Sequence, residues 1–272
     1  MTATMTATTN WNALLESWDK QQTAYIEFRE ERFSLMIQAL ADHLGERFTF
    51  VDLGCGPGSL TQRILDAFPQ ATAIAVDTDP VLLTMARHFL ARFGARANVV
   101  DADMRAPDWT ARLPVQQIDA AVSTTAMHWL MPEQLIKAYS DIVALMPAGG
   151  MVLNGDHFAF ERTAPCAHQL SLADRSRAQK RLLAQPDVLN WESWWQAMER
   201  EPALQAAFAE RASKQAQADA IYGERHTSTL SNLSLHELAL RHAGCSEVAT
   251  IWQRFENRIL MGIKGGLLPA AE

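Results

Sequence analysis

A glycine-rich segment carries the most informative chemistry of the sequence. It reads VDLGCGPGS at residues 51–59 and contains Gly54, Gly56 and Gly58. Glycines let the backbone turn tightly and approach a ligand closely, and the start of a following helix offers free N–H groups. Asp77 stands nineteen positions after Gly58, where a carboxylate can accept both hydroxyls of an adenosine ribose. The pattern predicts a nucleoside-containing cofactor.

Two further acidic residues bear on which cofactor this is. Asp103, with Met104 beside it, can hold an adenine amino group. Asp52 precedes the glycines, where it can organise the N–H groups of the loop or hold a ligand ammonium. A nicotinamide enzyme normally shows G-x-G-x-x-G, whereas this loop reads G-x-G-x-G and Asp52 would oppose a pyrophosphate. Asp77 suits both ligands, so the glycine spacing and Asp52 count against a dehydrogenase.

Short β-rich runs alternate with helical runs and must position these residues. Strands are expected at residues 48–53, 72–76, 97–100 and 118–123 and from residue 151 onward. Strands that alternate with helices indicate βαβ units and a mostly parallel sheet. Two closely joined strands, 248–252 and 258–263, must be antiparallel, because a parallel return needs a crossover of about a dozen residues. The expected fold class is α/β, with a seven-stranded sheet whose last strand is reversed.

Composition and charge argue against several classes of protein. The 272 residues carry a formal charge of −7, which disfavours binding of duplex nucleic acid or an anionic membrane through bulk charge. No apolar run approaches the ~18 residues of a membrane span, and the opening MTATMTATTN lacks the features of a signal peptide. Three scattered cysteines are too few for a metal site and suit a reducing compartment. We expect a cytoplasmic protein that binds no duplex nucleic acid, no membrane and no metal.

Four motifs resemble those of class I S-adenosylmethionine-dependent methyltransferases. They are DLGCGPGS at 52–59, VDTDP at 76–80, DADM at 101–104 and DAAVSTTAMHW at 119–129. The resemblance is strong over residues 48–155 and moderate over 235–264, in the style of small-molecule enzymes such as trans-aconitate methyltransferase and its relatives. It implies a Rossmann-like fold, S-adenosylmethionine as cofactor and S-adenosylhomocysteine as product.

The same resemblance implies roles for individual residues. The glycine loop would pass over the methionine part of the cofactor, Asp77 would take the ribose, and Asp103 with Met104 would frame the adenine. Tyr25 and Arg29 resemble residues that close over the methionine carboxylate, although a solvated charged face explains residues 29–32 equally well. Beyond the glycines, the implied cofactor-binding residues are Tyr25, Arg29, Asp52, Asp77, Thr78, Asp103, Met104 and Ser123.

Two histidines are candidates for the proton removal that some methyl acceptors require. His128 lies in the loop after the fourth strand, where the family places the methyl group. There it serves as a general base, as a hydrogen-bond donor to substrate, or only to pack the loop. His157 follows Asp156 after the fifth strand, at the edge where open α/β sheets bind ligands. Trp129 either covers the adenine, faces the sulfonium by cation–π attraction, or belongs to the core.

The segment from about residue 160 to 245 is helical by composition and too long for a single crossover. Trp194 and Trp195 share one helical face with Trp191, either as a small helical core or as an aromatic wall that touches substrate. Tyr222 and His226 are further substrate candidates. The expected organisation is a tail and helical lid (1–45), a cofactor-binding core (46–159), a helical substrate cap (160–245) and a C-terminal hairpin (246–272).

The predicted function is transfer of a methyl group to a small molecule by a monomer or homodimer. The methylated atom stays open. The fourth strand lacks the Asn/Asp-Pro-Pro-Tyr/Phe motif of amino methylation, and its loop lacks the carboxylates of a magnesium-dependent catechol enzyme. Three alternatives remain: a tRNA or protein methyltransferase, a regulatory protein that keeps the cofactor site without catalysis, and a different reaction, such as a cyclisation, in the same pocket.

Overall fold

One sheet forms the centre of the computed structural model, which describes residues 9–223 and 232–266. Within these residues seven strands follow the order β3-β2-β1-β4-β5-β7-β6, with β1 to β5 parallel and β7 antiparallel to both neighbours. The predicted class and the reversed last strand are therefore confirmed. The strands are β1 (Thr49–Leu53), β2 (Thr72–Asp77), β3 (Ala97–Asp101), β4 (Ala120–Thr124), β5 (Met151–His157), β6 (Cys245–Arg254) and β7 (Asn257–Lys264).

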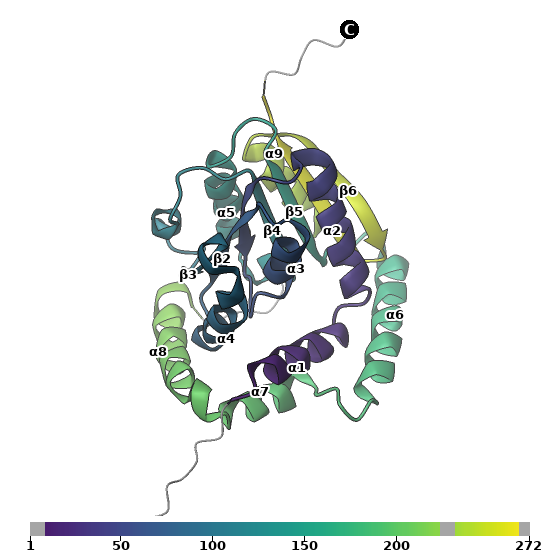
Figure 1. Ribbon diagram of the computed structural model, residues 1–272. Helices are drawn as coiled ribbons and strands as arrows, with labels where there is room; N and C mark the ends of the chain where they lie inside the picture. The colour runs from purple at the N-terminus through teal and green to yellow at the C-terminus, as the bar shows by residue number, and fades with distance from the viewer. Residues whose placement is uncertain (1–8, 224–231, 267–272) are drawn as a thin grey trace, which may run out of the picture.

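Helices cover both faces of this sheet (Figure 1). The helices α2 (Arg29–Leu44), α3 (Ser59–Ala67) and α4 (Pro80–Leu90) lie on one face, and α5 (Pro132–Ala144) and α9 (Leu233–His242) on the other. Side chains alternate between the two faces, as in β1, where Phe50 packs toward α2 and Val51 toward α5. Among the residues that the structure describes, none of the helices combines the length and the apolar character needed to cross a bilayer.

The N-terminal helical pattern is divided between two helices, α1 (Trp11–Thr23) and α2. The chain turns between them, and Phe28 adopts a left-handed backbone with φ 59°. No proline or glycine marks this break. Tertiary contacts impose it, because Ile26 is buried and the Tyr25 hydroxyl accepts a hydrogen bond from the Trp191 N–H at 2.8 Å.

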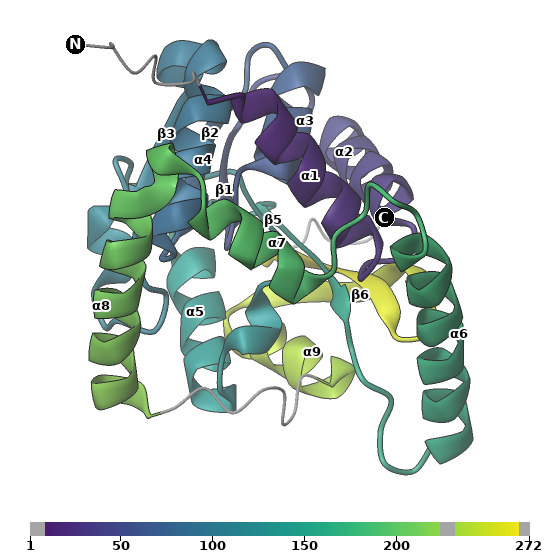
Figure 2. The same cartoon turned by 90° about the horizontal axis from the view of Figure 1, so that it is seen from below.

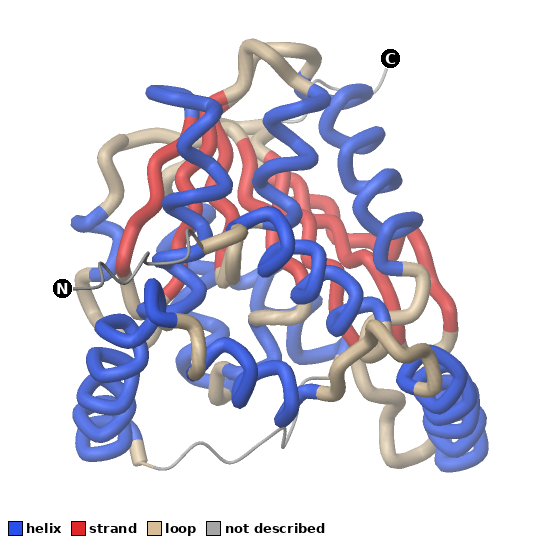
Figure 3. Tube along the Cα trace, turned by 60° about the horizontal axis from the view of Figure 1, so that its bottom comes forward, coloured by secondary structure: helices blue, strands red, loops and turns tan. Residues whose placement is uncertain are grey.

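The predicted cap is formed by three helices, α6 (Pro165–Leu183), α7 (Trp191–Glu199) and α8 (Gln205–Tyr222). α7 runs beside α1 across the end of the sheet (Figure 2), and α6 and α8 stand on opposite sides of the molecule (Figure 3). Helix α9 departs from the predicted cap, because Ala239 and Leu240 are buried against the sheet. The short 3-10 helices are η1 (Ala91–Arg96), η2 (Trp109–Arg112), η3 (Met127–Trp129) and η4 (Pro202–Leu204).

Candidate active site at the carboxyl ends of the strands

The glycine loop joins β1 to α3 with three left-handed residues. Gly54, Gly56 and Gly58 have φ of 69°, 56° and 89°, a region that side chains rarely adopt. A Cβ on Gly54 would lie 2.3 Å from the Cβ of Ala126, so the loop after β4 packs directly on the glycine loop. The predicted loop geometry therefore serves packing between loops as well as access for a ligand.

Asp77 holds this loop from the end of β2. Its carboxylate accepts the Gly56 N–H at 2.8 Å, the Thr78 N–H at 2.7 Å and the Asp79 N–H at 2.9 Å. Burial raises the pKa of Asp77, and these backbone hydrogen bonds oppose that rise. Asp77 and the glycines, which sequence analysis selected separately, thus form one unit, and Thr78 joins it through its backbone.

Asp52 is fully buried in β1 and is bound by α3. Its Oδ2 accepts the Thr61 hydroxyl at 2.6 Å, while Oδ1 has no hydrogen-bond partner among the described residues. Burial raises the pKa of Asp52 to about 7. The sequence suggested the N–H groups of the loop or a ligand ammonium as partners of Asp52, and within the protein a side-chain hydroxyl of α3 binds this carboxylate.

Helix α1 lies over the glycine loop as a lid. The Trp18 ring comes within 3.6 Å of the position that a Cβ of Gly56 would take. Asp19 accepts the Ser59 hydroxyl at 2.7 Å and forms ion pairs with Arg29 at 2.9 Å and Arg63 at 3.1 Å.

Tyr25 and Arg29 have partners within the protein. Arg29 is only 3% exposed, and its guanidinium lies 4.6 Å from the centre of the Phe33 ring. Burial lowers its pKa, and Asp19 offsets part of that effect. The interpretation of residues 29–32 as a solvated face is wrong for Arg29 and Arg32, which are both buried. Tyr25 contacts α7 through its hydroxyl.

The predicted adenine end lies against α8. Asp103 forms a bidentate ion pair with Arg105, whose guanidinium stacks on the Tyr222 ring at 4.4 Å. Met104 is partly buried against the main core. Two ion pairs, Arg211 with Asp79 and Lys214 with Asp101, fix α8 to the ends of β2 and β3. His226 lies outside the described residues.

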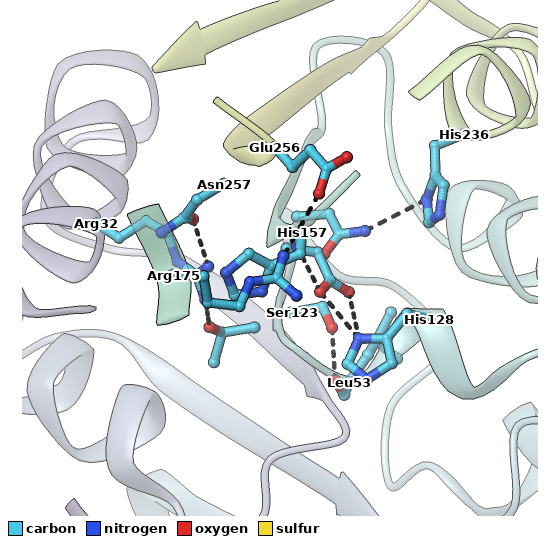
Figure 4. Close-up of polar contacts among 12 residues, drawn as sticks. Arg32, Leu53, Ser123, His128, His157, Arg175, His236, Glu256 and Asn257 are labelled. Atoms are coloured by element: carbon cyan, nitrogen blue, oxygen red, sulfur yellow. Dashed lines mark hydrogen bonds and ion pairs between the residues drawn. The ribbon is translucent and has the colours of Figure 1, made fainter. Parts of the chain in front are cut away.

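His128 and Asp156 form an ion pair at the ends of β4 and β5 (Figure 4). The Nδ1 atom of His128 lies 2.9 and 3.0 Å from the two carboxylate oxygens. Burial favours the neutral imidazole, but Asp156 outweighs it and raises the pKa of His128. Burial likewise opposes the charge of Asp156, yet His128, His157 and Arg32 hold its pKa well below the ordinary range.

His157 lies on the other side of the same carboxylate. Its N–H donates to Asp156 Oδ1 at 2.8 Å, and its Nε2 lies 3.1 Å from Oε2 of Glu27 in the turn between α1 and α2. Burial lowers the pKa of His157 despite the Glu27 contact. The two predicted base candidates are thus brought together around Asp156, each with a different carboxylate partner.

Ser123 and the tryptophans occupy different surroundings. The buried Ser123 hydroxyl donates to the Leu53 carbonyl at 2.8 Å and joins β4 to β1. Trp129 is 44% exposed, with its ring 5.1 Å from that of His128. Trp194 is fully buried and packs edge-on against Trp18 at 4.9 Å, and Trp195 stacks under Arg211 at 4.0 Å. A separate core thus joins α1, α4, α7 and α8.

Sequence reasoning did not select Arg32 or Arg175 for this site. Arg32 of α2 is fully buried and donates to Asn257 and Thr124. It belongs to the apolar stripe of α2 with Met36 and Leu40, and that position is the signal that predicts its burial. Arg175 of α6 reaches Glu256 at 3.6 Å, a contact between segments about eighty residues apart that no local pattern reveals.

Comparison with known proteins relates the core of the chain to one family. Residues 50–150 match a family described as "Methyltransferase domain". The trans-aconitate 2-methyltransferase of Azoarcus sp. is 35% identical over 117 residues, which are 43% of this chain and 42% of that protein. The trans-aconitate 2-methyltransferase of Escherichia coli is 29% identical over 135 residues, 49% of each chain. The chain therefore matches about half the length of these relatives or less.

One solved structure has helices and strands in a similar arrangement, and it aligns with most of the chain. The magnesium protoporphyrin IX methyltransferase of Synechocystis PCC 6803, solved with bound SAH, aligns with a TM-score of 0.52 at 12% identity, covering 92% of this chain and 95% of that one. At this identity the likeness concerns the fold alone. The family match over residues 50–150, together with the strand order and the glycine loop, supports a class I S-adenosylmethionine-dependent methyltransferase domain in this part of the chain.

Proposed function

We propose that the protein transfers a methyl group from S-adenosylmethionine to a small-molecule acceptor. The observation that carries this proposal is the unit formed by the glycine loop and Asp77. Three left-handed glycines follow β1, and a carboxylate at the end of the neighbouring strand β2 is held in place by three backbone N–H groups. In an open α/β sheet this edge is the position where ligands bind.

The residues at this edge suit the three parts of the cofactor. Asp77 is oriented by N–H donors and can accept ribose hydroxyls with its remaining lone pairs. Asp103 and Arg105 lie beside Tyr222 at the expected adenine end. The glycine loop and α1 would enclose the methionine part. When bound, the cofactor would supply an activated methyl group.

His128 is the proposed base or orienting group for the acceptor. Asp156 binds its Nδ1 and leaves Nε2 as the nitrogen that can accept a proton. Alignment of the acceptor with the methyl group contributes in either case. His157 is the second candidate, and its contact with Glu27 links it to the lid.

We further propose that the acceptor carries a carboxylate. His157, Arg175 and Arg254 line a small pocket together with Glu27 and Asp174, and Asp174 pairs with Arg254 at 3.0 Å. The buried Nε of Arg175 has no hydrogen-bond partner among the described residues, and an anionic group could supply the acceptor that it lacks. Two relatives of the core are named for trans-aconitate, which is a carboxylic acid.

A labelled-methyl assay tests the proposal. The purified protein is incubated with methyl-labelled S-adenosylmethionine and a panel of carboxylic acids, phenols and amines, and each product is identified by mass. We expect labelled product from a carboxylic acid and a raised KM for that acid in Arg175→Met. Arg177→Met is the matched control on the same helix, because the Arg177 side chain is 71% exposed. Binding of S-adenosylhomocysteine without turnover of any acceptor would favour a regulatory protein instead.

A further inference from the structure

Arg32 is a buried cation that spans three neighbouring strands. One arm of its guanidinium donates to Asn257 Oδ1 at 2.9 Å, at the start of β7, and the other donates to the Thr124 hydroxyl at the end of β4. Between them lies Gly155 of β5, where a Cβ would come within 2.9 Å of Arg32 Nε. The side chain therefore crosses β5 one residue before Asp156, and a glycine is needed to let it pass. Figure 4 shows Arg32 reaching Asn257.

Such a cation needs a negative partner, since a charge buried alone is strongly disfavoured. Burial lowers the pKa of Arg32 to about 10, and Asp156 is the largest influence that supports its charged form. Arg32 is therefore charged at neutral pH. Asp156 pairs directly with His128, and the charge of Arg32 acts on the same carboxylate without forming an ion pair with it.

The same arginine connects the site to the lid. Asn257, which accepts from Arg32, donates through Nδ2 to the backbone carbonyl of Glu27 at 2.6 Å. The Glu27 carboxylate contacts His157 at 3.1 Å. Arg32, which lies across β5, is thus linked through Asn257 to the turn between α1 and α2.

We propose that Arg32 is a positioning residue whose cation, fixed across β5 at Gly155 by Asn257 and Thr124, balances the charge of Asp156 and keeps His128 able to accept a proton at neutral pH. This inference rests on the proposed function, because the proton affinity of His128 matters to the reaction only if His128 binds the acceptor or takes its proton. Arg32 itself is too deeply buried to contact the acceptor, so it would act through its charge and through the strands that it joins.

Several charged groups surround the His128–Asp156 pair, and their signs decide how the pKa of His128 should change when Arg32 is replaced. Asp156 raises the pKa of His128, whereas Arg32 and Arg175 lower it. His157, Tyr139 and His236 also interact with Asp156, from β5, α5 and α9. Glu27 influences His157 on the far side of the carboxylate. Arg175 is one-third exposed and partly screened, so Arg32 is the main fixed charge that opposes Asp156.

Nuclear magnetic resonance titration of the His128 ring tests the inference without any acceptor. His128→Gln identifies its signals, and the pKa of His128 is then compared in the wild type, Arg32→Met and Arg32→Lys. We expect a higher pKa in Arg32→Met and a value near wild type in Arg32→Lys, which keeps the charge. If the rate depends on neutral His128, the acidic limb of the kcat/KM profile moves to higher pH in Arg32→Met. At low pH, kcat/KM then falls tenfold for each unit by which the pKa of His128 rises.

Thr124→Val provides a second test if Arg32→Met does not fold. It removes one acceptor of the guanidinium but keeps the positive charge in the protein, so a shift of Arg32 away from β4 should raise the pKa of His128 by a smaller amount. An unchanged His128 pKa in folded Arg32→Met, or in Thr124→Val where Arg32→Met is unfolded, would overturn the inference. A lower melting temperature without that shift means a merely structural role and overturns it too. A shifted pKa in a protein that methylates nothing would contradict the proposed function alone.

Discussion

Replacing Asp156 with Asn probes the centre of the candidate site. Asn keeps the size of the side chain and can still accept the His157 N–H, which lies 2.8 Å from Asp156 Oδ1. It removes the charge that faces His128 at 2.9 Å and leaves the buried Arg32 without its carboxylate. The variant therefore isolates the charge of the pair from its shape.

The structure sets the size of the effect. A hydrogen bond to a charged group contributes about 1.5–3 kcal/mol, and breaking a buried ion pair costs about 3–5 kcal/mol. The Asp156 side chain is fully buried, but that of His128 is 27% exposed, which places the pair below the fully buried limit. We expect Asp156→Asn to lower the free energy of unfolding by about 2–3 kcal/mol under conditions where both groups are charged.

The pH dependence has a definite sign. The folded pKa of His128 is raised above its ordinary 6.5, so its contribution is complete below that value and is lost as pH rises through the folded pKa. The folded pKa of Asp156 is depressed below 3.8, so its contribution is present above that value and is lost as pH falls through the folded pKa. The difference between wild type and variant is therefore largest between these two ordinary values.

Urea unfolding at about pH 5.5 and about pH 8.5 measures this difference. The loss should be larger at the lower pH. Asp187→Asn is the control, because its ion pair with Lys20 is solvent-exposed and should change stability little. Equal losses at both pH values, or no loss at pH 5.5, would refute the assignment of a charged His128–Asp156 pair.

Three further predictions concern the cofactor edge, the lid and the cap. Asp77→Ala should weaken binding of S-adenosylhomocysteine at least tenfold in calorimetric titration, since it removes a charged acceptor. Asp66→Ala, at an exposed side chain of α3, should not weaken it, and equal affinities of the two variants would contradict the ribose role. Asp19→Ala should release α1 and speed proteolysis between α1 and α2, and an unchanged cleavage rate would show that Trp18 suffices. Trp194→Ala should lower the free energy of unfolding by about 3–5 kcal/mol in thermal and urea denaturation; loss of acceptor turnover with intact stability would instead place Trp194 in the substrate site.

The sheet and the glycine loop were predictable because their signals are local. The glycines, Asp77 and the strand before each lie within thirty residues. The parallel direction of β1 to β5 follows from the alternation of strands and helices, and the reversed last strand follows from the short final hairpin. The fourth strand was expected at residues 118–123 and spans Ala120–Thr124, a shift of the kind that fraying at strand ends produces. Local propensity decided these elements, and tertiary contacts only adjusted their ends.

The break between α1 and α2 and the departure of α9 from the cap have another origin. Tyr25 and Phe28 continue the spacing of the α2 stripe, so periodicity alone extends the helix through them. Contacts with α7 and a left-handed Phe28 end it. Helix α9 has the composition of the cap, but its apolar side packs against the sheet next to α5. Which surface an amphipathic helix covers depends on chain segments distant in sequence.

The polar side chains at the candidate site separate most clearly into those that the local sequence predicts and those that depend on contacts distant in sequence. His128 and His157 stand out as histidines at strand ends, yet their chemistry depends on Asp156 between them and on Arg32 and Glu27 more than 90 residues earlier in the chain. Arg32 occupies an apolar stripe, where its charge is disfavoured unless a carboxylate lies within reach. The buried arginine, the glycine that it crosses and the aspartate that follows are therefore best explained together. A buried cation and a buried carboxylate are each unfavourable alone, and together they surround His128 with balanced charge, as the proposed role of its second nitrogen toward an acceptor requires.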